Sequence, residues 1–297
     1  MICRRPACTP GCLDAPAAEL RRGRIGQLAV VGRTLWAVLI SVALIHLLTP
    51  GGGSRAELRG VWLLHRRSAA ILRALGITVH THGTPREGGA LVVGNHQSFL
   101  DILVMSAQTP LHQIAKTEVG GWPLVGGLAT RTGTRFLDRS ALSTLPLLVD
   151  DAVALLRSGR KVQAFPEATT RCGGAIDEFH RCVFQAAIDA AVVVAPVTVR
   201  YAGPDGSPVN APAFVGDETL ADSLRRVLAL RGLTVQVNWL SPIPAIAGTG
   251  HRATDRRRLT TLVQDAVARD LQVPVVWRSG RRLADVPTTR VGAYAGA

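Results

Sequence analysis

Hydrophobic and polar positions in the first quarter of the chain predict two helices behind an unstructured start. Residues 1–24 show no regular spacing of apolar side chains, so we expect a disordered, basic lead-in. Residues 28–48 are almost continuously apolar, with Arg33 as the one charged position. Their uncharged part, 34–48, would form a helix about 22 Å long, which barely crosses a bilayer core of about 30 Å even with Arg33 snorkelling. Residues 56–75 place arginines on one helical face and apolar side chains on the other.

These two helices indicate that residues 25–76 form a membrane anchor. Arginines flank the apolar helix on both sides, so the distribution of positive charge does not favour a simple crossing. We prefer a helical pair that dips into one leaflet, on the cytoplasmic face of the cell membrane. The alternative for the second helix is an ordinary core helix with a solvated arginine face. A cleaved signal peptide fits poorly, because no small-x-small cleavage site precedes the break at 50–53.

From residue 77 onward, short β-branched runs alternate with helical periodicity, which predicts an α/β domain over residues 77–271. The expected strands are 77–81, 90–93, 111–115, 161–165, 192–201 and 234–240. The expected helices are 99–107, 142–158, 183–190, 219–230 and 256–271. This alternation predicts a mixed, mostly parallel sheet covered by helices. Residues 272–297 lack periodicity and are expected to form a loose tail.

The strongly basic composition calls for an anionic partner. The formal net charge is +13 and the sequence pI is about 11.1. Aromatic residues make up only 4% of the chain, and no run of basic and aromatic residues suggests base stacking. We therefore expect anionic lipid or a phosphorylated substrate as the partner, and not nucleic acid.

The cysteines do not have the spacing of a disulfide framework. Cys3, Cys8 and Cys12 lie in the lead-in, whereas Cys172 and Cys182 lie inside the expected α/β domain. Three cysteines could hold a metal ion, but no fourth ligand follows at the usual spacing. We expect unbridged thiols in a mobile segment, and no metal site.

The candidate chemistry begins where a strand breaks at Gly94. His96 follows the break, and Ser98 is a good N-cap for the next helix. Residues five apart in one continuous helix point about 140° apart, so His96 and Asp101 meet only if His96 precedes the helix. Asp101 could then orient His96 as a general base. It could equally close a capping box with Ser98, and the local sequence leaves both interpretations open.

Two further stretches carry polar side chains that could bind a substrate. Glu167 follows a strand ending in Phe-Pro, so it should emerge at the carboxyl end of the sheet, where α/β folds bind ligands. The side chains behind it could bind a polyol and a phosphate: Thr169, Thr170 and Arg171. Residues 131–139 hold three arginines near a glycine turn. They form either a phosphate site or a salt-bridged surface edge.

Four sequence blocks, taken in order, resemble the glycerolipid acyltransferase family. This is the family of 1-acylglycerol-3-phosphate acyltransferases and related lysophospholipid acyltransferases. The blocks are Asn-His-x4-Asp at 95–101, Gly-x-x-Phe-x-x-Arg at 133–139, Phe-Pro-Glu-x-Thr-Thr at 165–170 and Val-x-Pro-Val at 194–197. Residues 114–118 also look like the family's segment between the first two blocks. Two positions depart from the family pattern: Ala168 stands where glycine is usual, and residues 179–182 replace a segment that usually carries lysine and glycine.

The resemblance implies acyl transfer from a thioester, acyl-CoA or acyl carrier protein, to the free hydroxyl of a lysophospholipid. The first acceptor to expect is 1-acylglycerol-3-phosphate, which would give phosphatidic acid. His96 would remove the hydroxyl proton and Asp101 would stabilise the imidazolium, while Glu167 and Arg139 would bind the polar head of the acceptor. Further substrate-binding residues are expected at Lys116, Phe136, Thr169, Thr170 and Arg171.

The same reasoning sets the expected partners and the alternatives. Partners are membrane phospholipids, the lysophospholipid acceptor and acyl-CoA; no cofactor is expected, because direct attack on a thioester needs none. Another acceptor, such as a lyso-ornithine lipid, lysophosphatidylglycerol or lysocardiolipin, is the first alternative. A non-catalytic membrane-binding relative is the second.

Overall fold

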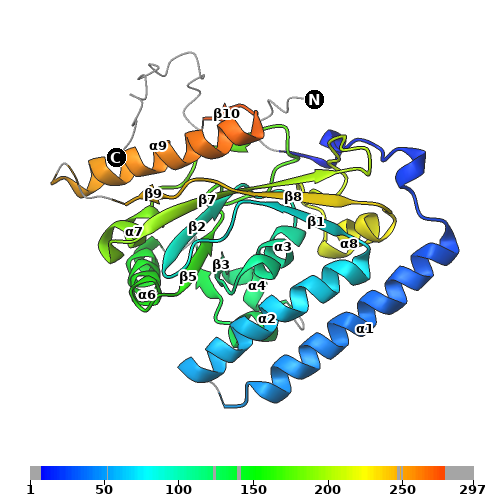
Figure 1. The fold of residues 1–297 in the computed structure, drawn as a ribbon, viewed down its shortest axis with the longest axis horizontal. Helices are drawn as coiled ribbons and strands as arrows, with labels where there is room; N and C mark the ends of the chain where they lie inside the picture. The colour runs from blue at the N-terminus through cyan, green and yellow to red at the C-terminus, as the bar shows by residue number, and fades with distance from the viewer. Residues whose placement is uncertain are drawn as a thin grey trace.

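The protein has an α/β fold: a mixed β-sheet with helices on both faces, preceded by a long helical hairpin (Figure 1). The computed structural model describes residues 8–51, 53–122, 125–138, 142–245, 248 and 250–277. The start of the lead-in with Cys3, the expected substrate residue Arg139 and most of the expected tail lie outside these residues. The fold class expected from the sequence, a mixed and mostly parallel sheet covered by helices, is confirmed.

Within the described residues, eight strands form the main sheet in the order β1-β8-β7-β2-β5-β3-β4, with β9 paired to β7. The strands are β1 (Thr78–His82), β2 (Ala90–Gly94), β3 (His112–Lys116), β4 (Arg135–Leu137), β5 (Lys161–Ala164), β7 (Val193–Ala202), β8 (Thr234–Trp239) and β9 (Ile243–Pro244). Only the pairs β7–β8 and β7–β9 are antiparallel. The carboxyl ends of β2, β5, β3 and β4 therefore meet at one edge of the sheet.

Helices fill the connections between these strands. They are α1 (Arg24–Leu48), α2 (Ser54–Leu75), α3 (Leu100–Gln108), α4 (Thr117–Gly120), α5 (Val125–Arg131), α6 (Leu145–Arg157), α7 (Phe184–Ala190), α8 (Leu220–Leu228) and α9 (Arg252–Leu271). Three 3-10 turns lie at Pro10–Cys12, Ala18–Leu20 and Leu142–Thr144. The sequence analysis missed the short elements α4, α5, β4 and β9, which span two to seven residues and lack a clear apolar pattern.

Two hydrophobic cores lie on opposite faces of the sheet, and strand β2 contributes side chains to both. Val92 belongs to the core shared with α2, α3 and α8. Its neighbours Leu91 and Val93 belong to the core shared with α6, α7 and α9. Successive side chains of a strand point to opposite faces, so a continuous apolar run is what a strand covered on both sides requires.

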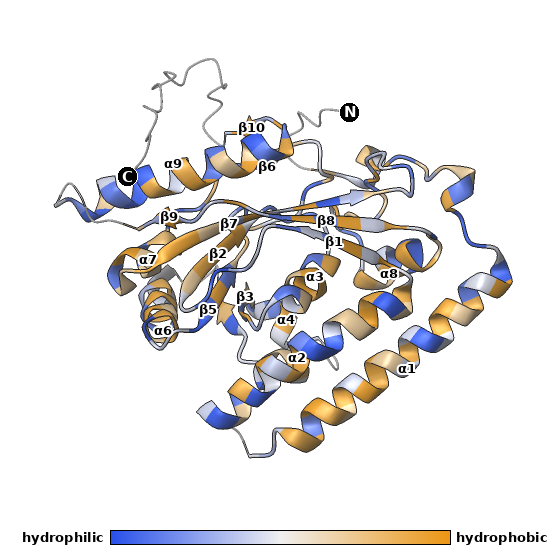
Figure 2. Ribbon diagram, in the orientation of Figure 1, coloured by the Kyte–Doolittle hydropathy of each residue, from blue (hydrophilic) through white to orange (hydrophobic). Residues whose placement is uncertain are grey.

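Helix α1 is longer than the uncharged run suggested, and its surface is apolar (Figure 2). It has 25 residues, or about 37 Å at 1.5 Å per residue, and by length and composition it could cross a membrane. A narrow stripe packs against α2, including Ala37 and Ile45. The outward side chains remain exposed, among them Trp36 at 67% and Leu39 at 59%.

Arg33, the arginine inside the apolar segment, binds the end of α2. Arg33 Nε donates to the Ala74 carbonyl oxygen at 2.5 Å, and Arg22 Nη2 donates to the Leu75 carbonyl oxygen at 2.9 Å. These carbonyls belong to the last turn of α2, where a helix leaves acceptors unpaired and carries partial negative charge. Both arginines therefore tie the start of the hairpin to the end of α2.

The described ends of the chain are ordered, in contrast to the disordered lead-in (1–24) and loose tail (272–297) expected from the sequence. Arg22 N donates to the Ala229 carbonyl oxygen at 2.8 Å, and the Leu20 carbonyl oxygen accepts from Arg231 N at 2.8 Å. At the other end, β10 (Val275–Val276) pairs in parallel with β6 (Ile176–Asp177). In both cases a distant segment supplies the partners, so no local periodicity announces them.

The close approach of α2 to α5 gives a first prediction. A Cβ at Gly60 in α2 would lie 2.1 Å from the carbonyl oxygen of Arg131, whereas one at Gly127 in α5 would have no heavy atom within 4 Å. We expect Gly60→Ala to lower the free energy of unfolding by about 1–3 kcal/mol through overpacking. Gly127→Ala, the control, should raise it by up to about 1 kcal/mol through helix propensity. Thermal unfolding in detergent compares them, and equal effects would contradict the packing shown.

Candidate active site

The candidate site lies where the carboxyl ends of neighbouring parallel strands meet. His96 follows β2, and Glu167 follows β5, the strand paired with β2. Lys116 ends β3, and Phe136 lies in β4 beside it. The prediction that Glu167 emerges at this edge is confirmed, because its carboxylate reaches the backbone of His96.

His96 and Asp101 form a hydrogen-bonded pair. The Nδ1 atom of His96 lies 2.9 Å from Oδ2 of Asp101. Asp101 is fully buried, whereas the His96 side chain is 20% exposed. Since a carboxylate can only accept, the contact places the imidazole proton on Nδ1 and leaves Nε2 as the nitrogen that can take a proton.

The same carboxylate also closes the start of α3. Asp101 Oδ2 accepts hydrogen bonds from the backbone N–H groups of Gln97 at 2.7 Å and Ser98 at 2.9 Å. Ser98 Oγ accepts from Leu100 N at 3.2 Å. One side chain therefore makes the contacts that both interpretations required, although Phe99, and not Ser98, is the N-cap of α3. Asp101 satisfies unpaired donors at the helix start and orients His96 as well.

A buried tyrosine holds the other oxygen of Asp101. Tyr201 lies in β7, and its hydroxyl donates to Asp101 Oδ1 at 2.5 Å. Burial, together with the charge of Asp101, raises the pKa of Tyr201 well above its ordinary value, so the hydroxyl remains a donor. No local pattern indicated this residue, because Tyr201 follows Asp101 by 100 positions and only the packing of β7 brings the two together.

The imidazole is held in plane by an aromatic neighbour. The rings of His96 and Phe165 stack with centroids 4.1 Å apart and an interplanar angle of 11°. Phe165 is the first residue of the Phe-Pro-Glu block, so the sequence contained this residue without indicating its contact. Stacking and the Nδ1 hydrogen bond together fix both the position and the rotation of the ring.

Three other segments form hydrogen bonds with the residues around His96. The side-chain amide of Asn95 pairs with both the N–H and the carbonyl of Val199, at 2.9 Å and 3.0 Å. Arg171 N donates to the His96 carbonyl oxygen at 2.9 Å, and Phe214 N donates to the Gln97 carbonyl oxygen at 2.9 Å. The loop is therefore fixed at nearly every backbone group, as a preorganised site requires.

Glu167 is buried and serves this same loop. Its Oε1 accepts from His96 N at 2.8 Å, and its Oε2 accepts from Asp177 N at 2.8 Å. Only 2% of the residue is exposed. Burial raises the pKa of Glu167 to about 8, although the two backbone hydrogen bonds lower it. These contacts give Glu167 the geometry of a positioning residue, and it also lines the cavity beside His96.

The residues behind Glu167 also make protein contacts. Arg171 is buried and forms an ion pair with Asp177, and Thr170 Oγ1 donates to the Phe214 carbonyl oxygen. Thr169 is exposed. Ala168 has a φ of +60°, the left-handed conformation that glycine adopts readily and that strains a residue with a Cβ. This explains why the family usually has glycine there.

Lys116 and Phe136 lie farther along the same edge. Strand β3 is separated from β2 by β5, and two strand spacings amount to about 10 Å. Lys116 is exposed at the end of its strand, and Phe136 is half-buried against Gly120. The structure thus brings Glu167 and Arg171 next to His96, and leaves Lys116 and Phe136 at a distance.

A cavity of about 690 Å³ opens beside His96. Its walls include Glu167, Arg171, Cys12 and Arg200. The volume falls in the range of about 300–1,000 Å³ found for small-molecule sites. A second cavity of about 690 Å³ lies under the start of α2, next to His112 and Lys161. Those residues begin β3 and β5, so it lies at the opposite edge of the sheet.

The raised pKa of Glu167 predicts a pH-dependent contribution to stability. The folded state holds this proton up to about pH 8, and the unfolded state releases it near 4.5. The contribution is therefore full below pH 4.5 and is lost as the pH rises to about 8. Against Glu167→Gln, which does not titrate, the free energy of unfolding of the unmodified protein should fall by up to about 1.4 kcal/mol per pH unit in this window.

Chemical denaturation at a series of pH values measures both proteins. The two proteins are compared by how steeply the free energy of unfolding changes with pH. The substitution also alters a hydrogen bond, and this shifts the absolute stability at every pH. Parallel pH profiles for the two proteins would show that Glu167 is ionised in the folded state at neutral pH.

Similarity to known proteins agrees with this site. Residues 76–200 match the family model described as Acyltransferase. A lyso-ornithine lipid O-acyltransferase from Pseudomonas aeruginosa is 34% identical over 72% of this chain and 78% of its own. A 1-acyl-sn-glycerol-3-phosphate acyltransferase from Neisseria gonorrhoeae is 31% identical over 76% of this chain and 87% of its own.

A solved structure shares the fold. The 1-acyl-sn-glycerophosphate acyltransferase from Thermotoga maritima superimposes with a TM-score of 0.60 at 15% sequence identity, covering 84% of this chain and 97% of that one. The sequence blocks, the matched relatives and the shared fold lead to one conclusion: this chain belongs to the glycerolipid acyltransferase family.

Proposed function

We propose that this protein transfers a fatty acyl group from a thioester, acyl-CoA or acyl carrier protein, to the free hydroxyl of a lysophospholipid. The observation that carries the proposal is the His96–Asp101 pair, with Nδ1 at 2.9 Å from a buried carboxylate. Such a pair leaves Nε2 available as a general base. The preferred acceptor is 1-acylglycerol-3-phosphate, which would yield phosphatidic acid.

The reaction proceeds by direct attack and involves no acyl-enzyme. Nε2 of His96 takes the proton of the acceptor hydroxyl as its oxygen attacks the thioester carbonyl carbon. The tetrahedral intermediate collapses, the C–S bond breaks, and the proton on His96 passes to the departing thiolate. Asp101 stabilises the imidazolium between these steps, as an acid does for a base histidine in other enzymes.

The basic residues of the sheet edge suit an anionic head group. Lys116 ends β3 about 10 Å from β2, a distance that suits a phosphate held away from the reacting hydroxyl. Arg139 follows β4 by two residues in the sequence, and a guanidinium binds phosphate with two parallel hydrogen bonds. Phe136, Thr169 and Thr170 complete the proposed acceptor site, while Glu167 and Arg171 hold its inner wall.

A lyso-ornithine lipid is the second candidate acceptor. The relative that favours it is the enzyme from Pseudomonas aeruginosa, whose name states that acceptor. Such a lipid has no phosphate, so Lys116 and Arg139 would matter less for it than for a phosphorylated acceptor. A non-catalytic role fits the site poorly, because a scaffold without activity would not need the oriented, partly exposed imidazole of His96.

The α1–α2 hairpin would keep this site at a membrane surface. The exposed apolar face of α1 exceeds what a soluble surface usually carries, and the opposite face is packed on α2. Arg67 Nε donates to Ser41 Oγ across the two helices at 3.1 Å, and α2 packs in turn on the α/β domain. Because α1 is joined to the domain along its length, we propose that it lies in one leaflet, on the cytoplasmic face, and does not cross.

The activity is tested by product identification with a panel of acceptors. Purified protein would receive labelled acyl-CoA or acyl carrier protein thioester, with 1-acylglycerol-3-phosphate, lyso-ornithine lipid, lysophosphatidylglycerol or lysocardiolipin. We expect acylated product from one or more, led by 1-acylglycerol-3-phosphate. His96→Ala should lower kcat by roughly 10²–10⁴-fold, since it removes the general base, and Asp101→Asn should lower it in the same direction.

His80→Ala is the matched control, because His80 is an exposed histidine on the edge strand β1. It should leave kcat unchanged, and circular dichroism should show the fold of every variant intact. Unchanged turnover in folded His96→Ala protein would refute the mechanism. Absence of product with all acceptors and both donors would refute the activity.

The anchor is tested by a charge on the exposed face of α1. Leu39→Asp places a carboxylate where we propose lipid contact, and a charge deep in a membrane helix is disfavoured by roughly 2.5–3.5 kcal/mol. We expect at least about tenfold weaker binding to vesicles of anionic phospholipid, equivalent to about 1.4 kcal/mol. Leu262→Asp, at an exposed leucine of α9, should bind as the unmodified protein does. Equal binding by both variants would exclude α1 as the anchor.

A further inference from the structure

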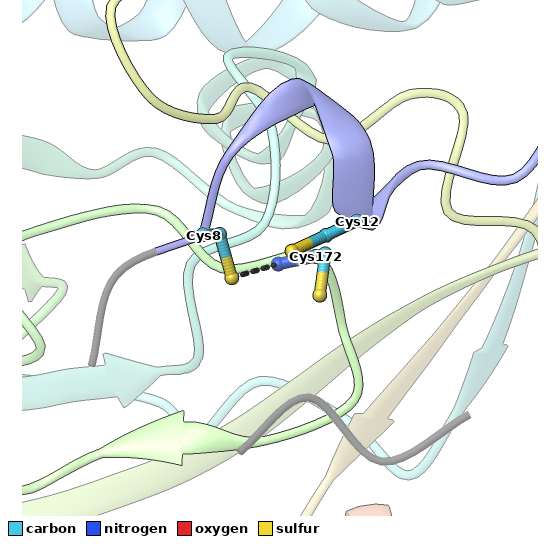
Figure 3. Close-up of side chains that lie close together, drawn as sticks. All are labelled: Cys8, Cys12 and Cys172. Atoms are coloured by element: carbon cyan, nitrogen blue, oxygen red, sulfur yellow. Dashed lines mark hydrogen bonds between the residues drawn. The ribbon is translucent and has the colours of Figure 1, made fainter. Parts of the chain in front are cut away.

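Cys8 and Cys12 lie close to Cys172, which is distant in the sequence (Figure 3). Cys12 and Cys172 also line the cavity beside His96. Cys8 precedes the first 3-10 turn, Cys12 is the last residue of that turn, and Cys172 lies in the loop after Glu167. Their sulfur atoms all lie within 4.8 Å of one another, and no disulfide joins them. Cys8 is 6% and Cys172 5% exposed. Cys8 and Cys12, expected from the sequence to be unbridged thiols in a mobile segment, pack in one hydrophobic cluster with Cys172.

Two donors contact the sulfur of Cys8. The Cys172 N–H donates to Cys8 Sγ at 3.4 Å, and Arg171 Nη1 donates to the same sulfur at 3.8 Å. These contacts hold the sulfur of Cys8 against the loop that carries Cys172. Cys182 lies outside this group of three.

The arrangement of the sulfurs fits a thiophilic metal ion. A Zn–S bond of about 2.3 Å in a tetrahedral site places its sulfurs about 3.8 Å apart, which the separation of at most 4.8 Å approaches. Cys8 and Cys12 are separated by three residues, within the two to four usual for a pair of zinc ligands. The third ligand comes from a distant loop, as in structural zinc sites that join two segments.

We propose that Cys8, Cys12 and Cys172 bind a thiophilic metal ion, foremost Zn²⁺. The three thiolates supply three positions of a tetrahedron, and the fourth is left to water or a further donor. The donors are sulfur alone, which selects Zn²⁺ over hard cations such as Mg²⁺ or Ca²⁺. The site is absent from the proposed acyl-transfer steps, so it stands or falls independently of them.

The bound ion would clamp the lead-in onto a wall of the active site. Arg171, next to Cys172, donates through its backbone N–H to the His96 carbonyl oxygen. Gly11 and Cys12 line the same cavity as His96. A metal ion that joins Cys8 and Cys12 to Cys172 would therefore fix one side of the cavity and steady the loop that carries His96.

The test measures metal binding by the full-length protein in detergent. Protein stripped with a chelator under reducing conditions would be titrated with Zn²⁺ and with Co²⁺. We expect one Zn²⁺ per chain by elemental analysis, and with Co²⁺ a sulfur-to-metal charge-transfer absorption. Cys8→Ser and Cys172→Ser should lose affinity by more than the roughly 10–100-fold that follows loss of an outer-shell partner. Cys182→Ser is the matched control and should bind as the unmodified protein does.

A second measurement follows the clamp itself. Zn²⁺ should slow hydrogen exchange of the backbone amides in residues 8–14 at least about tenfold in the unmodified protein, and should leave it unchanged in Cys172→Ser. Three results would each overturn the proposal. The first is the absence of bound Zn²⁺, and the second is a charge-transfer band that survives in the Cys8→Ser/Cys172→Ser double variant. The third is a disulfide among these cysteines in protein kept under reducing conditions. If Zn²⁺ binds but hydrogen exchange of residues 8–14 does not change, the proposed clamping of the lead-in is overturned.

Discussion

The site depends on a single buried carboxylate. Asp101 accepts four hydrogen bonds, from the imidazole of His96, two backbone amides at the start of α3 and the hydroxyl of Tyr201. A buried anion is tolerated only when its charge is met by donors of this kind. The helix start, the imidazole and strand β7 are thereby joined at one point, and the direction of Nε2 follows from the fold of the domain.

The backbone around His96 is also held by polar side chains. Asn95 extends the pairing of β2 with β7 beyond the last strand residue, and Glu167 closes the gap to β5 by accepting the His96 amide. A polar residue used in this way is protected from solvent, which accounts for its raised pKa. The strands on either side of β2 therefore both hold the loop, β7 through Val199 and β5 through Glu167, the residue that follows it closely.

Hydrogen bonds and packing connect the N-terminal region to the site. Arg22 and Arg33 bind the last carbonyls of α2, and the lead-in pairs with residues around α8 before it reaches the cavity at Cys12. The apolar face of α1 is thus fixed in orientation relative to His96. An enzyme that takes one substrate from a lipid surface gains from this rigidity, because approach to the surface also orients the site.

The sequence by itself determined the fold class, the main strands and helices, and the identity of the central pair. Apolar runs and helical spacing report local burial, and the order of the four blocks made His96 and Asp101 stand out. It missed α4, α5 and β4, which are too short to show a period, and it could not decide between helix cap and catalytic carboxylate. Only the tertiary structure showed that Asp101 contacts both the backbone before α3 and the imidazole of His96. It also showed that Glu167 supports the loop and that Tyr201 and Phe165 hold the pair. It also brought Cys8 and Cys12 to Cys172. These contacts join residues far apart in the chain, and their partners are set by the packing of the sheet and not by any local pattern.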